Sequence, residues 1–152
     1  KIIPISCCMG AVYSTSVQFW NKIGGLQGLK KYGSDEPLMS IKTWLAGGKV
    51  LLIKDWGVGH LYRSSSPYKV PLKTLDQNHL YLINLFCKDK KDIERYENNL
   101  RKRIGDNRFD LAKIEFEKQR ESLEDFKKYF YDEVAVHDLN WFLRNINSKL
   151  IS

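Results

Sequence analysis

The distribution of glycine and proline constrains the fold of this 152-residue chain more than any other feature. Nine of the ten glycines and all four prolines lie within the first 71 residues, and the single later glycine is Gly105. Both residue types interrupt helices, because glycine costs backbone entropy and proline lacks an N–H donor. The chain therefore divides near residue 75 into a first part with many breaks and a second part that is free to form long helices.

The second part, residues 76–152, has apolar residues at helical spacing. One such set stands three and four positions apart: Ile93, Tyr96, Leu100 and Ile104. This spacing places them on one face of a helix. Asp76 is a candidate N-cap for an earlier helix. We also expect a long amphipathic helix over about 108–131 and a last helix over about 137–150. This part is predicted to be almost entirely helical and to carry no catalytic group.

The first part, residues 1–75, alternates between short apolar runs and short helical patterns. The run at 2–13 predicts a buried strand, and the run at 49–54 predicts a second strand. A helix is expected after a serine-rich stretch, and a second one begins at Ser34 or Asp35 as N-cap. Alternation of strands and helices is typical of the α/β class.

The net charge of +7 comes entirely from the first part. Residues 76–152 contain 15 basic and 15 acidic side chains, whereas residues 1–75 contain 10 basic and 3 acidic ones. A basic half with an adjacent acid pair, Asp35 and Glu36, indicates an anionic ligand beside a place for acid–base or metal chemistry. The alternative is an ordinary lysine-rich surface. A nucleic-acid partner is not expected, because no basic block, RNA-binding aromatic pattern or zinc spacing is present.

Several classes of protein are disfavoured by simple counts. No apolar run approaches the ~20 residues that span a bilayer. The three cysteines, Cys7, Cys8 and Cys87, do not resemble a disulfide framework and indicate a reducing compartment. The first residues, KIIPISCCMG, lack the layout of a signal peptide, so we expect a cytoplasmic protein, with the inner face of a membrane as a candidate location. A chain that opens in a strand-like run is also expected to be part of a longer protein.

The residues that indicate chemistry form an ordered series between positions 10 and 63. In chain order these are a small-residue strand, a short helix ending in Ile23-Gly24-Gly25, the sequence Gly33-Ser34-Asp35-Glu36 at a helix start, Trp44, Gly47-Gly48, a strand, and Val58-Gly59-His60-Leu61-Tyr62-Arg63. This series resembles the C-terminal half of GT-A fold glycosyltransferases of bacterial type, both the inverting family 2 enzymes and the retaining polypeptide N-acetylgalactosaminyltransferase type. The resemblance implies that residues 1–75 are the acceptor side of a catalytic domain, followed by a helical extension over residues 76–152.

The resemblance also implies catalytic roles for the acid pair. Gly33-Ser34-Asp35-Glu36 stands where these enzymes carry a Glu-Asp-like or Gly-Glu-Asn-like motif, and in the inverting members an acid there is the general base. The usual order is reversed here, so either Asp35 or Glu36 is a candidate. Two carboxylates at a helix N-terminus stay ionised in the field of the helix dipole and can accept a proton or orient a hydroxyl. The alternative is that both only cap the helix.

The same comparison of motifs implies a metal and further substrate contacts. His60 stands where the N-acetylgalactosaminyltransferase type places a histidine ligand for Mn²⁺, and a hydrogen-bonded loop histidine is the alternative. Arg63 stands where a basic residue often lies near the donor diphosphate, and Trp56 with Gly33 and Ser34 is assigned to substrate binding. Mn²⁺ or Mg²⁺ would neutralise charge on the leaving diphosphate. No Asp-x-Asp or Asp-x-His motif is placed to serve here, so we expect an upstream half to supply it.

The predicted function is transfer of a sugar from a nucleotide-diphosphate donor to a hydroxyl of a glycan or lipid-linked acceptor, as in polysaccharide biosynthesis. The 152 residues alone are expected to be inactive. One alternative is a non-catalytic helical assembly module that carries a glycosyltransferase-like remnant. The extension is a candidate for peripheral membrane contact, although its zero net charge gives little attraction to anionic lipids. The sugar, the stereochemistry and the oligomeric state do not follow from the sequence.

Overall fold

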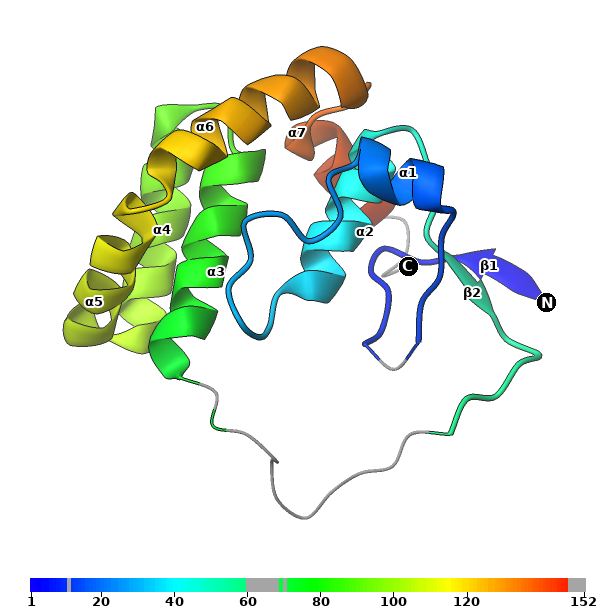
Figure 1. The fold of residues 1–152 in the computed structure, drawn as a ribbon, viewed down its shortest axis with the longest axis horizontal. Helices are drawn as coiled ribbons and strands as arrows, with labels where there is room; N and C mark the ends of the chain where they lie inside the picture. The colour runs from blue at the N-terminus through cyan, green and yellow to red at the C-terminus, as the bar shows by residue number, and fades with distance from the viewer. Residues whose placement is uncertain (11, 60–68, 70, 148–152) are drawn as a thin grey trace. The chain divides into compact units, whose positions relative to one another are not determined.

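A computed structural model describes residues 1–10, 12–59, 69 and 71–147 (Figure 1). The elements in chain order are β1 (Ile2–Pro4), α1 (Val17–Lys22), α2 (Asp35–Leu45), β2 (Leu51–Ile53), α3 (Leu72–Phe86), α4 (Lys90–Ile104), α5 (Asp106–Glu117), α6 (Arg120–Tyr129), the π-helical turn η1 (Phe130–Val134), α7 (Leu139–Phe142) and a second π-helical turn η2 (Leu143–Asn147). The described chain is thus mostly helical, and the predicted α/β character is limited to one pair of short strands.

The chain forms two compact units that alternate along the sequence. Unit 1 comprises Lys1–Leu26, Asp35–Lys69 and Val134–Ser152, and unit 2 comprises Gln27–Ser34 and Val70–Glu133. The predicted boundary at residue 75 separates a catalytic half from a helical extension, and this functional division stays a prediction.

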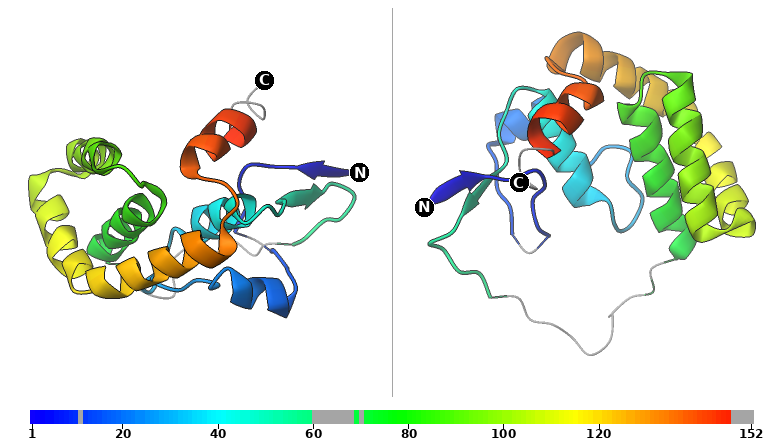
Figure 2. Two further views of the ribbon diagram at one scale, coloured as in Figure 1. Left: turned by 90° about the horizontal axis from the view of Figure 1, so that it is seen from above. Right: turned by 180° about the vertical axis from the view of Figure 1, so that it is seen from behind.

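The strands of unit 1 are shorter and more exposed than predicted. β1 and β2 pair antiparallel, with Ile3 opposite Leu52, and each contains three residues (Figure 2). The second strand predicted at 49–54 is confirmed as β2, although Leu51 and Ile53 are about half exposed. The buried strand predicted over 2–13 is wrong, because only Ile2–Pro4 is a strand and Ile2 is 62% exposed. The physical reason is that a two-stranded ribbon has no second layer of its own to cover either face.

Helix α2 provides most of the core of unit 1. Its buried side chains include Leu38, Met39, Trp44 and Leu45, and Ile23 after α1 is also fully buried. Trp44 donates a hydrogen bond from its indole nitrogen to the carbonyl of Ile5, at 3.2 Å. The carbonyl of Leu45 accepts from the backbone N–H groups of Val136 and His137. These bonds fix both the N-terminal segment and the start of the last helical stretch against α2.

A lysine is buried in the middle of this core. The Lys42 side chain is fully inaccessible to solvent, and its Nζ donates a hydrogen bond to the carbonyl of Gly25. Gly24 and Gly25 have positive φ angles, 69° and 43°, so they turn the chain sharply after α1. Burial lowers the pKa of Lys42 to about 7 from the ordinary value of 10.5. Lys42 is therefore only partly charged near pH 7, while its hydrogen bond to Gly25 fixes the turn.

We expect this lysine to make the stability of the protein depend on pH. Between pH 7 and 10.5 the unfolded chain binds a proton at Lys42 that the folded chain does not. The free energy of unfolding should therefore rise with pH in this window, by up to ~1.4 kcal/mol per unit, and the contribution should level off below pH 7. Urea denaturation at pH 7, 8 and 9 measures it. Lys42→Met should remove the slope and exposed Lys49→Met should keep it; parallel curves for wild type and Lys42→Met would contradict the prediction.

The helices of unit 2 pack around α3. Helices α3, α4 and α5 contact one another, and α6 also contacts α3 (Figure 1). The core contains Leu80, Leu85, Phe109, Phe116 and Leu123, each less than 5% exposed. No strand occurs in the described part of residues 76–152, which confirms the prediction of a helical second part there. In the stretches that the structure describes, no helix is both long and apolar enough to cross a membrane.

Two helix boundaries differ from the predictions. α3 begins at Leu72, so Asp76 lies inside it rather than at its N-cap. The Asp76 carboxylate is buried and pairs with Arg108 of α5 at 2.8 Å. The single helix predicted over 108–131 is divided into α5 and α6 at Lys118 and Gln119. Apolar spacing alone does not reveal such a break, because both helices present their apolar faces to the same core.

Candidate functional site

The acid pair predicted from the sequence stands at the N-terminus of α2. Asp35 and Glu36 are the first two residues of the helix and are half-buried. Ser34 precedes them with φ at 70°, and Gly33 with φ at 91°. Ser34 is therefore in the left-handed region rather than in the extended conformation usual for a capping serine. The predicted helix start is confirmed, and of the two predicted caps, Asp35 is the first residue of the helix itself and Ser34 stands directly before it with an unusual backbone.

Position 33 requires glycine for both a steric and a conformational reason. A side-chain carbon there would collide with Cδ2 of Leu75, and its φ angle disfavours any other residue type. The backbone at Gly33 thus approaches helix α3 closely, within unit 2. This local path leads directly into Asp35.

The two carboxylates have different surroundings in unit 1. Tyr13 lies near Asp35, and its hydroxyl donates a hydrogen bond to Oδ2 at 3.5 Å. Burial, and then the negative charge of Asp35, raise the pKa of Tyr13, so the phenol keeps its proton at neutral pH. Glu36 places Oε1 directly over the Cα of Gly10, where any Cβ would overlap it. Asp35 therefore has a donor beside it, and Glu36 lies against bare backbone.

A small polar network connects the N-terminal segment to the first turns of α2. The backbone N–H of Cys8 donates to Oγ of Ser40 at 2.9 Å, and the Ser40 hydroxyl lies 3.3 Å from Sγ of Cys8. The Cys8 thiol in turn lies 3.7 Å from the carbonyl of Glu36. Because Ser40 is 1% exposed, these contacts fix the segment that carries Gly10 against the helix that carries the acids.

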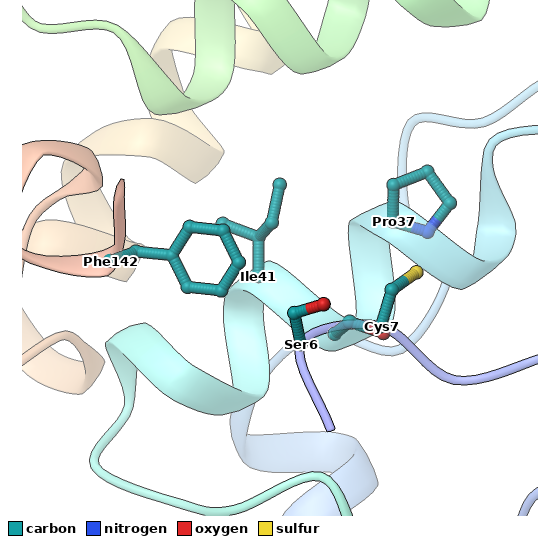
Figure 3. Close-up of a pocket in the computed structure, with 6 residues that line it drawn as sticks. Ser6, Cys7, Pro37, Ile41 and Phe142 are labelled. Atoms are coloured by element: carbon teal, nitrogen blue, oxygen red, sulfur yellow. The ribbon is translucent and has the colours of Figure 1, made fainter. Parts of the chain in front are cut away.

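A hollow of about 180 Å³ lies beside the same helix. Its lining residues are Ser6, Cys7, Pro37, Ser40, Ile41 and Phe142. Figure 3 shows Phe142 and Ile41 together at one end and Cys7 and Pro37 at the other. Neither Asp35 nor Glu36 lines it, so the cleft predicted to receive these carboxylates stays a prediction.

The remaining predicted site residues are only partly described. Trp56 is 79% exposed and packs into no core, which leaves its predicted substrate contact open. His60 and Arg63 lie outside the described residues. Across the described ranges, no group of three or more His, Cys, Asp or Glu side chains is arranged to hold a metal ion. A metal site contained within the described part of this chain is therefore not supported by its donor set.

Sequence reasoning missed three residues whose polar contacts the structure shows: Tyr13, Lys42 and Asn78. Asn78 on α3 is fully buried and makes hydrogen bonds to residues 30–33. A signal was present, because Asn78 follows Leu75 by three positions and so interrupts an apolar helix face. A polar residue at an apolar position indicates a buried hydrogen-bonding role. Tyr13 and Lys42 carried no comparable signal.

Similarity to known proteins places the chain in a broad functional class. It is 30% identical to human polypeptide N-acetylgalactosaminyltransferase 3 over 139 residues, which covers 86% of this chain and 22% of that protein. It is 28% identical to mouse polypeptide N-acetylgalactosaminyltransferase 6 over 147 residues, and 28% identical to polypeptide N-acetylgalactosaminyltransferase 3 of Taeniopygia guttata over 153 residues. The last two alignments each cover 93% of the chain. The chain is glycosyltransferase-like. No protein-family model and no solved structure matches it.

These glycosyltransferase-like alignments change two earlier expectations. An alignment over 93% of the chain extends through most of residues 76–152, so the similarity is not limited to the motifs before residue 64. The relatives named here come from a bird, a mouse and a human, and a bacterial type is not supported. The chain spans between 10% and 25% of the length of the curated relatives it matches.

Proposed function

We propose that this chain forms the acceptor-side part of a glycosyltransferase that transfers N-acetylgalactosamine to a polypeptide hydroxyl. The observation that supports this most directly is the acid pair Asp35-Glu36 at the start of α2, together with the 30% identity to human polypeptide N-acetylgalactosaminyltransferase 3 over 86% of the chain. Their names supply the sugar and the polypeptide acceptor. The sequence alone predicted a glycan or lipid-linked acceptor, and the assay below compares these acceptors with a polypeptide.

The proposed reaction assigns the proton to the acid pair, the role that the resemblance implies for the inverting enzymes; for the retaining N-acetylgalactosaminyltransferase type this role is part of the present proposal. A carboxylate of Asp35 or Glu36 accepts a hydrogen bond from the acceptor hydroxyl and takes its proton as the new bond to the sugar forms. The bond between the sugar and the diphosphate breaks, and the nucleoside diphosphate leaves with its electron pair. The positive end of the α2 dipole lies beside both carboxylates. The hydroxyl of Tyr13 already donates a hydrogen bond to Asp35, so the proposal favours Glu36 as the group that accepts the proton.

A divalent metal, Mn²⁺ or Mg²⁺, belongs to the same proposal. We propose that this chain supplies one metal ligand, His60. One imidazole cannot hold such an ion alone, and the described residues contain no group of His, Cys, Asp or Glu side chains that could complete the site. The remaining ligands would come from the donor diphosphate and from an upstream half. When bound, the metal would neutralise charge on the leaving diphosphate.

A transfer assay tests the function. A protein that carries this chain together with a donor-binding half is incubated with UDP-N-acetylgalactosamine and, separately, with a serine- and threonine-rich peptide, an oligosaccharide and a lipid-linked sugar. We expect a mass increase of one N-acetylhexosamine on the peptide. Transfer only to the oligosaccharide or the lipid would overturn the polypeptide acceptor, and no transfer with any donor would favour the non-catalytic module.

The isolated 152-residue chain should bind nucleotide sugars poorly. The contacts to the base and ribose are proposed to lie in the upstream half, and the hollow beside α2, at about 180 Å³, is smaller than a typical ligand pocket. Calorimetry with UDP, GDP and TDP sugars in the presence of Mn²⁺ measures this. Dissociation constants above about 1 mM are expected. Micromolar binding would show that this chain itself contains the donor site.

A further inference from the structure

Gly10 is the residue against which the Glu36 carboxylate lies, and both residues belong to unit 1. A Cβ atom at position 10 would overlap Oε1 of Glu36, whereas Cδ would stand 3.2 Å and Cγ 3.6 Å from that Cβ. The steric conflict is therefore centred on the end of the Glu36 side chain. In glycine a hydrogen takes the place of Cβ, so a Cα–H bond points toward the carboxylate and leaves it in close contact with the backbone.

The backbone conformation at position 10 does not itself require glycine. Gly24 and Gly47 have φ angles of 69° and 77°, in the left-handed region that favours glycine, whereas the φ angle of Gly10 lies outside that region. Alanine can therefore adopt the same backbone, and it loses less conformational entropy than glycine on folding. The reason for a glycine here is the room that it leaves for the Glu36 carboxylate.

The segment before Gly10 is fixed to the helix that carries Glu36. The backbone N–H of Cys8 donates to Oγ of Ser40 on α2 at 2.9 Å, and Ser40 is 1% exposed. The Cys8 thiol also lies 3.7 Å from the backbone carbonyl of Glu36. Because these contacts hold the segment, an added methyl group at position 10 would be accommodated by the flexible end of the Glu36 side chain. A side chain at position 10 would therefore move the carboxylate and leave the backbone in place.

We propose that Gly10 is a positioning residue for Glu36: its bare Cα lets the carboxylate occupy the place from which it takes the proton of the acceptor hydroxyl. The catalytic consequence rests on the proposed function. The steric part, that the group at position 10 sets the place of the carboxylate, stands independently of any activity. Gly10 itself is not assigned a contact with substrate. A displacement of about 1 Å at a reacting group can lower a rate by about 10²-fold.

NMR spectroscopy of the 152-residue chain tests the steric part. With glutamate labelled at the carboxylate carbon, the Glu36 resonance is assigned by its loss in Glu36→Gln. Gly10→Ala should shift this resonance. The matched control, Gly57→Ala, should leave it in place, because no described atom beyond the chain neighbours lies within 4 Å of a Cβ at position 57. An unchanged Glu36 resonance in Gly10→Ala would overturn the proposal.

Circular dichroism covers the case in which Gly10→Ala does not fold. The double variant Gly10→Ala with Glu36→Ala removes the atoms that the new methyl group would meet. A folded double variant would assign the conflict to the Glu36 side chain, as proposed. An unfolded double variant would overturn the proposal, because the methyl group would then conflict with something other than the carboxylate.

Kinetics in a protein that joins this chain to a donor-binding half test the catalytic part. Gly10→Ala should lower kcat about tenfold or more with little change in the donor KM, since misplacement of a reacting group costs rate rather than donor binding. In a Glu36→Gln background the same substitution should change kcat by less than about twofold, because its effect is transmitted through the carboxylate that has been removed.

The outcomes separate this inference from the proposed function. If Glu36→Gln loses activity but Gly10→Ala does not, the inference fails and the proposed function survives. An equal loss from Gly10→Ala with and without Glu36→Gln would also overturn the inference, because the methyl group would then act elsewhere. A loss confined to Asp35→Asn would assign the proton to Asp35 and overturn it as well. If Asp35→Asn and Glu36→Gln are both fully active, the proposed function fails, whatever the NMR data show.

Discussion

Replacement of Asp35 by Asn, or of Glu36 by Gln, is expected to lower kcat by a factor on the order of 10² or more for at least one of the two variants. The measurement is the steady-state rate of sugar transfer by a protein that carries this chain with a donor-binding half. Both substitutions keep the shape of the side chain and remove its ability to take a proton. The donor KM should change little, because the proposed contact is with the acceptor hydroxyl.

The surroundings of the pair make Glu36 the more sensitive position. The Asp35 carboxylate already accepts a hydrogen bond from Tyr13, and the Glu36 carboxylate lies over Gly10. Asp110→Asn is the matched control, since Asp110 is an exposed carboxylate on α5 that pairs with Arg101. A wild-type kcat in both Asp35→Asn and Glu36→Gln would contradict the proposed base and would show that the two acids only cap the helix.

Replacement of Arg108 by Ala is expected to produce the largest loss of stability, about 2–4 kcal/mol. Arg108 donates from Nε and Nη2 to the two carboxylate oxygens of Asp76, at 2.8–3.1 Å, and the Asp76 side chain is only 4% exposed. Removal of the guanidinium leaves a buried charge without this partner, which costs more than the pair itself contributes. The expected loss of stability is smaller than for a fully buried pair, because the Arg108 side chain is 42% exposed and solvent screens its charge.

Urea denaturation of the 152-residue chain measures this loss. Lys128→Ala is the control, because Lys128 and Asp132 form an exposed pair in which both side chains are more than half accessible, and its removal should cost no more than about 1 kcal/mol. The double variant Arg108→Ala with Asp76→Leu should recover part of the stability, since no buried charge remains. A similar small loss in Arg108→Ala and Lys128→Ala would show that water replaces the guanidinium at Asp76.

The sequence predicted the elements that depend on local patterns. The helix start at Asp35, the helix after the serine-rich stretch and the helical second part all follow from residue type and spacing, and the structure contains each of them. A buried strand was predicted from the apolar run at 2–13, but burial requires a covering layer, and no local pattern reveals whether one is present. Asp76 was predicted to be an N-cap because a local pattern does not show its ion-pair partner, Arg108, which stands 32 positions away.

The candidate site was predictable only in part, again for physical reasons. The motif Gly33-Ser34-Asp35-Glu36 identifies the acids because its residue types are unusual together. The contacts that the acid pair makes with Tyr13 and Gly10 are non-local and leave at most a weak mark in the sequence. His60 and Arg63 stay predictions from motif resemblance alone.

Acceptor cross-linking tests most directly the claim that this chain forms the acceptor side. A peptide acceptor with a photoreactive group next to its reactive hydroxyl is bound to the protein that carries this chain, in the presence of donor, and the cross-linked peptides are identified by mass spectrometry. The predicted result is cross-linking to residues 33–36, competed by unlabelled peptide. Cross-links confined to residues outside this 152-residue chain, in a protein that still transfers sugar, would contradict the claim.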